Sequence, residues 1–214
     1  MIFDQNMLGS EFNLHLGCGP IILDNFINID GEFNFINKDI PFNQIFKVNE
    51  KINSFILKYD LRRGLPDFSV EYNVIYHSHF IEHLTLKDGR NLLADCFARL
   101  KNGGVLRFAV PDIEKWCSNY VAGNESFFNE YRNKYLKDNK EIYPTKSSVM
   151  TAMLYNWGHN AVYDFEYLGQ LAEKIGFSVV NKMPWGKSDL LKNISSIEGI
   201  DHRAFESLVI ECVK

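Results

Sequence analysis

Two glycines and a following aspartate form the clearest chemical pattern in this chain. The apolar segment 14–16 runs into Gly17-Cys18-Gly19, and ten residues separate Gly19 from Asp30, which ends a second apolar segment. Glycines let the backbone turn tightly and approach a ligand closely. A carboxylate at the end of the next strand can accept hydrogen bonds from both hydroxyls of a ribose. The pattern therefore predicts a nucleoside-containing cofactor at the carboxyl edge of a parallel sheet.

The spacing of these residues disfavours a dinucleotide. A nicotinamide or flavin fold needs Gly-x-Gly-x-x-Gly and an acidic residue about 20 positions further on. Here no third glycine follows the pair, and Asp30 comes much sooner. A nicotinamide-dependent oxidoreductase is thus the weaker hypothesis. Simpler alternatives are a tight turn for the glycines and a helix or turn cap for Asp30.

Two further strand ends carry polar side chains. Asp60 follows the expected strand 54–59, and His77-Ser78-His79 ends the expected strand 73–77. Ligands of doubly wound sheets bind outside the carboxyl ends of the strands, so these residues are expected to share one site. Asp60 is placed to accept from an exocyclic adenine amine. Its alternative role is to cap the turn at 62–64.

The histidines supply candidate general bases. His79 and His159 are the two candidates, with His79 expected to face the substrate. A metal site is not expected, because His79 and His83 share a face only within a helix and the H-E-x-x-H pattern is missing. Glu82 or His83 is expected to orient neighbouring backbone. The alternative for His159 is a loop histidine that helps to order a lid.

Apolar runs alternate with helical patterns, which predicts an α/β fold. We expect a doubly wound, Rossmann-like, mostly parallel sheet of seven strands with an antiparallel edge strand. The expected strands are 12–16, 26–29, 54–59, 73–77, 105–110, 177–181 and 207–213. The clearest helix is 84–100, with an apolar face that includes Leu86 and a stop at 102–104. Segment 31–51 is expected to be a loop with a short helix.

One domain is expected over residues 1–214. Residues 113–160 are interpreted as a helical insertion after the fifth strand that lies over the strand ends as a lid. Its aromatic side chains either stack on an acceptor or pack the insertion against the domain, and packing is favoured for most of them.

The composition of the chain limits the classes of partner that we expect. The chain has 214 residues and a formal net charge of -4, so a general attraction to nucleic acid is not expected. Its four cysteines include no C-x-x-C pair, which is typical of a reducing cytoplasm. No apolar run has membrane-spanning length and no signal-peptide pattern is present. The expected partner is a small molecule rather than nucleic acid or a membrane.

The ordered motifs resemble the class I S-adenosylmethionine-dependent methyltransferases, closest to the short type 11-like subgroup. The matching segments are LHLGCG at 14–19, FINID at 26–30, YDLRRGLPDFS at 59–69, VIYHSHFIEHL at 74–84, LKNGGVLRFAVPD at 100–112 and GHNAVYDFEYLGQLAEKIGF at 158–177. Two departures stand out: Pro20 and Ile21 stand where many members carry further glycines, and the segment after the first turn is too short for a full helix.

The resemblance implies a role for each residue. Gly17, Cys18 and Gly19 would contact the methionine part of S-adenosyl-L-methionine, and Asp30 would bind its ribose. Asp60 and the backbone of Leu61 would hold the adenine, while His77 and Ser78 would lie near the carboxypropyl chain or the methyl group. The acceptor would be O or N of a small molecule, with a sugar or nucleotide-sugar of surface-glycan synthesis as one candidate. The alternative is a non-catalytic module that binds the cofactor and transfers nothing.

Overall fold

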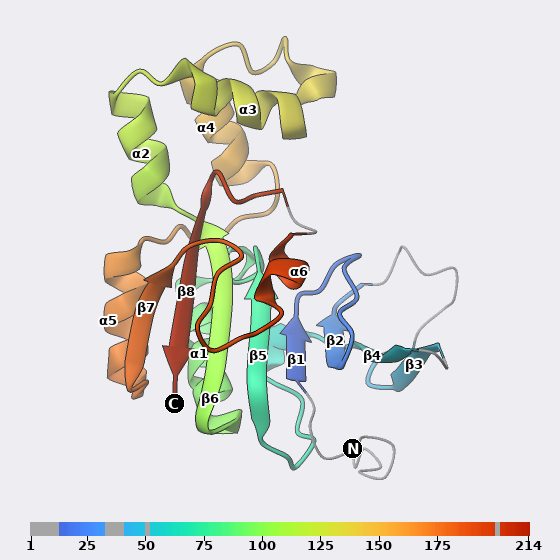
Figure 1. Cartoon of the computed structure of the whole chain (residues 1–214). Helices are drawn as coiled ribbons and strands as arrows, with labels where there is room; N and C mark the ends of the chain where they lie inside the picture. The colour runs from blue at the N-terminus through green and yellow to red at the C-terminus, as the bar shows by residue number, and fades with distance from the viewer. Residues whose placement is uncertain (1–12, 33–40, 50–51, 200–201) are drawn as a thin grey trace.

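The computed structural model describes residues 13–32, 41–49, 52–199 and 202–214. Within these ranges eight strands form one sheet in the order β3-β4-β2-β1-β5-β6-β8-β7 (Figure 1). The strands are β1 Asn13–Leu16, β2 Phe26–Asp30, β3 Ile45–Asn49, β4 Ile52–Lys58, β5 Tyr72–Ser78, β6 Leu100–Pro111, β7 Val179–Met183 and β8 Ser207–Val213.

The central strands are parallel and the antiparallel pairs lie toward the two edges. Strands β4, β2, β1, β5 and β6 run parallel to one another, which confirms the predicted mostly parallel α/β sheet. Strand β8 is antiparallel to both β6 and β7, so β7 and β8 together form the predicted antiparallel edge on this side.

The predicted number of seven strands is one too few for the described residues. The additional strand β3 lies in the segment expected to be a loop, and it pairs antiparallel with β4 at the opposite edge. Its sequence, Ile-Phe-Lys-Val-Asn, is rich in residues that favour strands. Ile45 packs against the main core, and this tertiary contact is not visible in a short local pattern.

Helices cover both faces of the sheet. They are η2 Leu61–Arg63, η3 Ile81–His83, α1 Leu86–Arg99, α2 Ile113–Val121, α3 Glu125–Tyr135, η4 Lys137–Asn139, α4 Lys146–Tyr155, α5 Phe165–Ile175 and α6 Ile194–Glu198. Helices α1 and α5 lie on one face, α6 lies on the other, and α2, α3 and α4 stand beyond the end of the sheet from which β6 leads into α2 (Figure 1). None of the described helices combines the length and the apolar character needed to cross a membrane.

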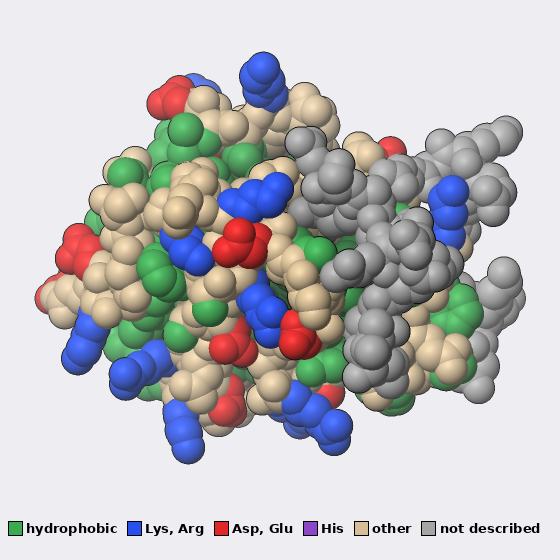
Figure 2. Space-filling view, turned by 90° about the horizontal axis from the view of Figure 1, so that it is seen from below, with side chains coloured by type: hydrophobic (Ala, Val, Ile, Leu, Met, Phe, Trp, Pro, Cys, Tyr) green, Lys and Arg blue, Asp and Glu red, His purple; other side chains and the backbone are tan. Residues whose placement is uncertain are grey.

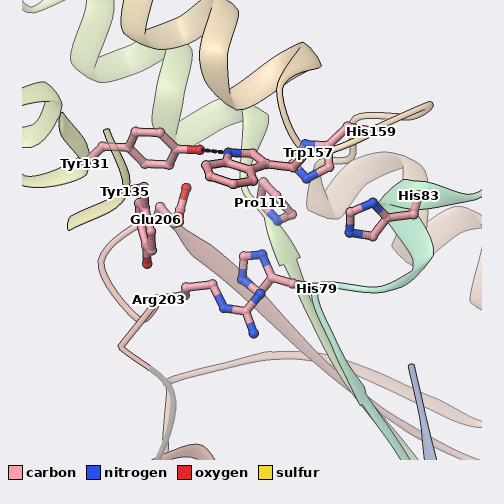
Figure 3. A pocket seen from close by; sticks show the side chains of 9 residues that line it. All are labelled: His79, His83, Pro111, Tyr131, Tyr135, Trp157, His159, Arg203 and Glu206. Atoms are coloured by element: carbon pink, nitrogen blue, oxygen red, sulfur yellow. Dashed lines mark hydrogen bonds between the residues drawn. The ribbon is translucent and has the colours of Figure 1, made fainter. Parts of the chain in front are cut away.

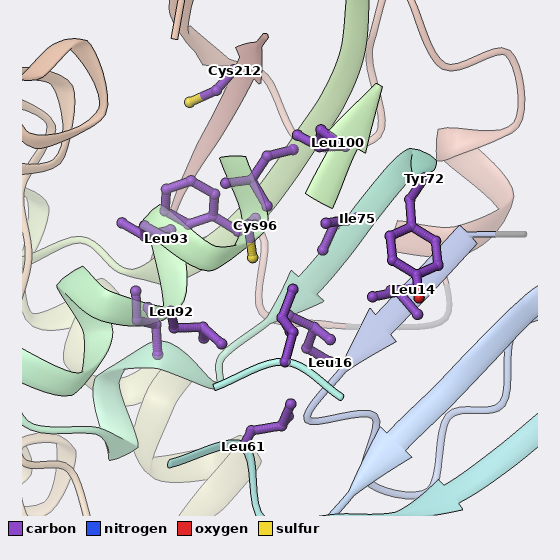
Figure 4. Close-up of a cluster of buried hydrophobic side chains, with 14 of the residues drawn as sticks. Leu14, Leu16, Leu61, Tyr72, Ile75, Leu92, Leu93, Cys96, Leu100 and Cys212 are labelled. Atoms are coloured by element: carbon purple, nitrogen blue, oxygen red, sulfur yellow. The ribbon is translucent and has the colours of Figure 1, made fainter. Parts of the chain in front are cut away.

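The main core lies between the sheet and the α1–α5 layer (Figure 4). Leu92, Leu93 and Cys96 carry the buried face of α1. The prediction that Leu86 lies on that face is wrong, because Leu86 is the first residue of the helix and its exposed fraction is 48%. The helix also ends at Arg99, before the predicted stop at 102–104, and those residues belong to β6.

Helices α2, α3 and α4 enclose an apolar cluster of their own. The Trp116 ring packs edge-on against Phe127, Phe128 and Tyr131, with ring centroids 4.9 to 5.7 Å apart. These aromatic side chains therefore pack chiefly among the three helices, whereas the sequence favoured packing of the insertion against the domain. That residues 113–160 form an insertion that closes over a ligand stays a prediction.

A buried ion cluster fastens the segment that carries α6 to the sheet. Arg107 on β6 donates from Nε and Nη2 to Glu198, both at 2.8 Å, and from Nη1 to Glu211 on β8 at 3.1 Å. All three residues are buried. The view from the end opposite α2–α4 shows Lys, Arg, Asp and Glu interspersed among its described residues, so this face presents no field of a single sign (Figure 2).

Candidate functional site

The glycine turn and the end of β2 form one hydrogen-bonded unit. Gly17 and Gly19 have φ values of 58° and 50°, in the left-handed region that favours glycine. The Cys18 amide donates to the Ile29 carbonyl at 3.1 Å, and the Gly19 amide donates to Asp30 Oδ2 at 2.8 Å. The structure thus brings Gly17, Cys18, Gly19 and Asp30 together as the sequence pattern predicted.

The side chains around this turn limit what it can do. The Cys18 thiol is buried, and burial raises its pKa far above the ordinary value, so this residue offers backbone groups rather than a nucleophile. Phe80 lies against Gly17: a Cβ atom at position 17 would come within 2.3 Å of the Phe80 ring. Only glycine meets both the space and the dihedral angle required there.

Asp60 caps the short helix η2, which was the simpler alternative for this residue. Its carboxylate accepts from the Arg62 amide at 3.1 Å and from Arg62 Nε and Nη2 at 2.8 and 3.0 Å. These bonds from Arg62 lower the pKa of Asp60. The Leu61 side chain is buried in the core. Asp60 still borders a cavity of about 320 Å³, whose other lining residues are Phe42, Asn43, Arg62 and Arg63.

His77 is a core residue in this structure. Its ring is fully buried and stacks on Phe108 with centroids 4.9 Å apart, and neither ring nitrogen has a hydrogen-bond partner within the described ranges. Burial lowers the pKa of His77 to about 3, so its ring is neutral at pH 7. Ser78 ends β5 opposite Ala109 and is half-buried.

A second cavity, of about 210 Å³, contains both predicted catalytic histidines (Figure 3). Its lining residues are His79, His83, Pro111, Tyr131, Tyr135, Trp157, His159, Arg203 and Glu206. They come from the chain after β5, the end of β6, helix α3, the segment after α4 and the segment before β8. The cavity therefore lies where the sheet meets the helices α2–α4.

His79 connects two polar groups. Its backbone is held at a φ of 49°, and its amide donates to the Ala109 carbonyl at 2.8 Å. The ring places Nε2 at 2.7 Å from Ser207 Oγ and Nδ1 at 3.3 Å from Glu82 Oε1. Desolvation by burial holds the pKa of His79 well below its usual range. At neutral pH its ring is therefore neutral, and Glu82 is placed to stabilise the cation that forms when the ring takes a proton.

His159 lies beside His83 and Glu82, which are remote from it in sequence. The two imidazole rings are T-shaped with centroids 4.9 Å apart. Burial lowers the pKa of His159 to about 4 and also lowers that of His83. The sequence indicated each histidine separately, but only the fold joins them.

Four further residues, three that line this cavity and one that contacts His79, were not selected from the sequence. Arg203 and Glu206 line the cavity, and Ser207 contacts His79. Trp157 donates from Nε1 to the Tyr131 hydroxyl at 2.8 Å. Arg203, Glu206 and Ser207 precede or begin β8, where no motif marks them. Trp157 lies two residues before His159 in the Trp-Gly-His segment.

Comparison with solved structures establishes the fold. A methyltransferase of Archaeoglobus fulgidus, described as dependent on S-adenosylmethionine, has a TM-score of 0.51 and 16% identity, over 97% of this chain and 88% of that one. The plantazolicin methyltransferase BpumL, bound to a pentazolic desmethylPZN analogue and SAH, has a TM-score of 0.56 and 12% identity, over 95% and 76%.

PKMT2 of Rickettsia typhi in complex with AdoHcy has a TM-score of 0.52 and 13% identity, and it is similar over 96% of this chain. The match spans 49% of PKMT2. No protein-family model and no curated protein matches the sequence. The chain thus has the fold of the class I methyltransferases, as the resemblance implied, while the type 11-like subgroup stays a prediction.

Proposed function

We propose that this protein is an S-adenosylmethionine-dependent methyltransferase that acts on O or N of a small molecule. The contact between the Gly19 amide and Asp30, at the end of β2, is the observation that carries the proposal. It lies at the carboxyl edge of a parallel sheet, where ligands of doubly wound folds bind. Two proteins that share this fold were solved with S-adenosylhomocysteine, which supports the same donor here.

The proposed donor site follows the strand ends. The backbone of Gly17, Cys18 and Gly19 would receive the methionine part, and Asp30 would accept from the ribose hydroxyls. The cavity beside Asp60 is a suitable place for the adenine, with the exposed Phe42 ring as a stacking surface, and the backbone of Leu61, the next residue in the chain, would be a further contact. Ser78 would lie near the carboxypropyl chain. His77 would support this wall by packing, since its ring is buried.

The proposed acceptor site is the cavity that contains His79 and His159. A sulfonium donor is already activated, so the protein chiefly needs to align the acceptor atom and exclude water. A hydroxyl acceptor must also lose a proton, and His79, backed by Glu82, is placed to take it, with His159 as the second candidate. Aromatic walls beside Arg203 and Glu206 suit a ring that carries polar groups, and a sugar is one such candidate.

The proposal is tested in two steps. Calorimetric titration with S-adenosylhomocysteine should show saturable binding, and titration with NAD should show none. Incubation with a donor labelled in its methyl group should then transfer label to a member of a panel of sugars, nucleotide-sugars, amines and phenols. Binding of the cofactor without transfer of label to any acceptor would favour the non-catalytic module. If the protein bound neither S-adenosylhomocysteine nor the methyl donor, the proposal would be refuted.

A further inference from the structure

We propose that Glu82, His83 and His159 bind a divalent metal ion of the zinc type at the wall of the acceptor cavity. One donor atom from each of these side chains lies within 4.8 Å of the other two. Two imidazoles and a carboxylate are a donor set that suits zinc, and catalytic zinc sites combine three protein ligands with one open position. The inference reverses the expectation, drawn from the sequence, that the chain has no metal site.

The separation of the donor atoms is close to that of a formed site. Zinc bonds of about 2.1 Å in a tetrahedron place the ligand atoms roughly 3.4 Å apart. Moving the side chains by about an ångström about their rotatable bonds would close the remaining difference. The His83 and His159 rings lie next to each other at one side of the cavity, with their centroids 4.9 Å apart (Figure 3).

The backbone clamps the two ligand-bearing segments together. The amides of Asn160 and Ala161 both donate to the Glu82 carbonyl, at 2.8 and 3.1 Å. The Asn160 side chain donates to the His83 carbonyl at 2.9 Å. These bonds fix the segment that carries His159 against η3, which carries the other two ligands. Such pre-organisation is what a metal site requires before the ion binds.

The polar groups around the cluster also favour an ion. The Nδ1 atom of His159 is buried and has no hydrogen-bond partner in the part of the chain that the structure describes. A buried nitrogen in that state is costly, and coordination would satisfy it. His79 Nδ1 lies 3.3 Å from Glu82 Oε1, the position of an outer residue that orients a ligating carboxylate. Glu206 lines the same cavity and adds a negative charge to a wall that also carries Arg203.

The open coordination position would face the cavity, because His83 and His159 both line it. A metal there would act as a Lewis acid on a bound hydroxyl and ease the loss of its proton. That consequence rests on the proposed function, and His79 would then be the remaining acid–base group. Metal binding itself does not depend on methyl transfer and is measured without any donor or acceptor.

The experiment uses the full chain without an affinity tag, stripped with a chelator and titrated with Co²⁺ as a visible probe. We expect one equivalent to bind with saturable d–d absorption, and one equivalent of Zn²⁺ to displace it. His83→Gln and His159→Gln should each weaken Co²⁺ binding by at least tenfold. His202→Gln is the matched control: His202 is an exposed histidine outside the cluster, and this variant should titrate as the wild type.

Circular dichroism and thermal melting check that each variant folds, and two ligand variants are used so that misfolding of one leaves the other informative. Added Zn²⁺ should also raise the melting temperature of the wild type and of His202→Gln more than that of the ligand variants. The inference is overturned by the absence of saturable Co²⁺ binding, or by binding that survives in the folded His83→Gln and His159→Gln proteins. Either result would leave the cluster as a hydrogen-bonding wall of the cavity.

Discussion

Asp30→Ala should weaken the binding of S-adenosylhomocysteine by roughly 100-fold. Asp30 already accepts from the Gly19 amide at 2.8 Å through Oδ2 and from the Glu32 amide at 3.0 Å through Oδ1. A carboxylate has about four acceptor sites, so two remain for the two ribose hydroxyls. Hydrogen bonds to a charged group contribute about 1.5–3 kcal/mol each. Asp30 is half-buried, so we take the lower value, and two such bonds give about 3 kcal/mol, or about two orders of magnitude in affinity.

The same substitution also removes two bonds within the protein. Losing both backbone partners should cost about 2 kcal/mol of stability, which lowers the melting temperature of a chain this size by about 4–8 °C. Affinity is therefore measured by calorimetry well below the melting temperature of the variant. Asp67→Ala is the matched control, because Asp67 also accepts from a backbone amide, that of Ser69 at 3.0 Å, but its partners lie outside the glycine turn.

The control variant should bind the ligand as the wild type does. If Asp30→Ala also bound S-adenosylhomocysteine within twofold of the wild-type affinity, the only role of the carboxylate would be to hold the backbone amides of Gly19 and Glu32. The proposed ribose contact would then be wrong, whatever the fold.

Three further outcomes follow from the packing. Arg107→Ala leaves Glu198 and Glu211 buried without their cation and should cost about 3–5 kcal/mol in urea unfolding, whereas Arg99→Ala, which breaks an exposed pair, should cost less than about 1 kcal/mol. An equal loss for both would contradict the role of the buried cluster. The pKa of His77 is about 3 in the folded protein against an ordinary 6.5, so below pH 6.5 the unfolded chain binds more protons and the free energy of unfolding decreases as the pH is lowered. The variant His77→Phe should reduce that slope, by about 0.7 kcal/mol per pH unit at pH 6.5 and by close to about 1.4 kcal/mol per pH unit at pH 4.5, and an unchanged slope would show that the ring is not buried in its neutral form. In Gly17→Ala the new methyl group meets the Phe80 ring, so this variant should destabilise the protein by at least about 1 kcal/mol more than Gly19→Ala. Gly19 is the matched control because its φ is also left-handed but the space around it is open. Equal melting temperatures of the two variants would count against the close contact with Phe80.

Local patterns were sufficient to predict how the residues of the proposed donor site lie together. Each of the residues Gly17, Gly19 and Asp30 belongs to a short segment in which a strand ends on a turn, so their sequence neighbours determine their positions. Asp60 shows the limit of this reasoning. A carboxylate before a turn can cap that turn or hold a ligand, and the choice depends on Arg62, whose side chain folds back onto it.

The cavity proposed for the acceptor was only partly predictable, because it is assembled from segments far apart in the chain. The sequence singled out His79 and His159, but the pairing of His159 with Glu82 depends on backbone bonds that form only in the folded protein. Arg203 and Glu206 carry no recognisable spacing. Strand β3 was missed for a similar reason, since its pairing with β4 and the packing of Ile45 decide its conformation.

The position of β8 sets the order in which this molecule can be completed during synthesis. Strand β7 joins the sheet through β8, which is made after it, and β6 presents one edge to the same late strand. Until residues 207–213 leave the ribosome, that edge of β6 exposes unpaired amides and carbonyls, a template for association with other chains. The same strand brings Ser207 to His79 and Glu211 to Arg107. The nascent chain can therefore form the glycine turn early, whereas the acceptor cavity and the buried ion cluster close in one late step.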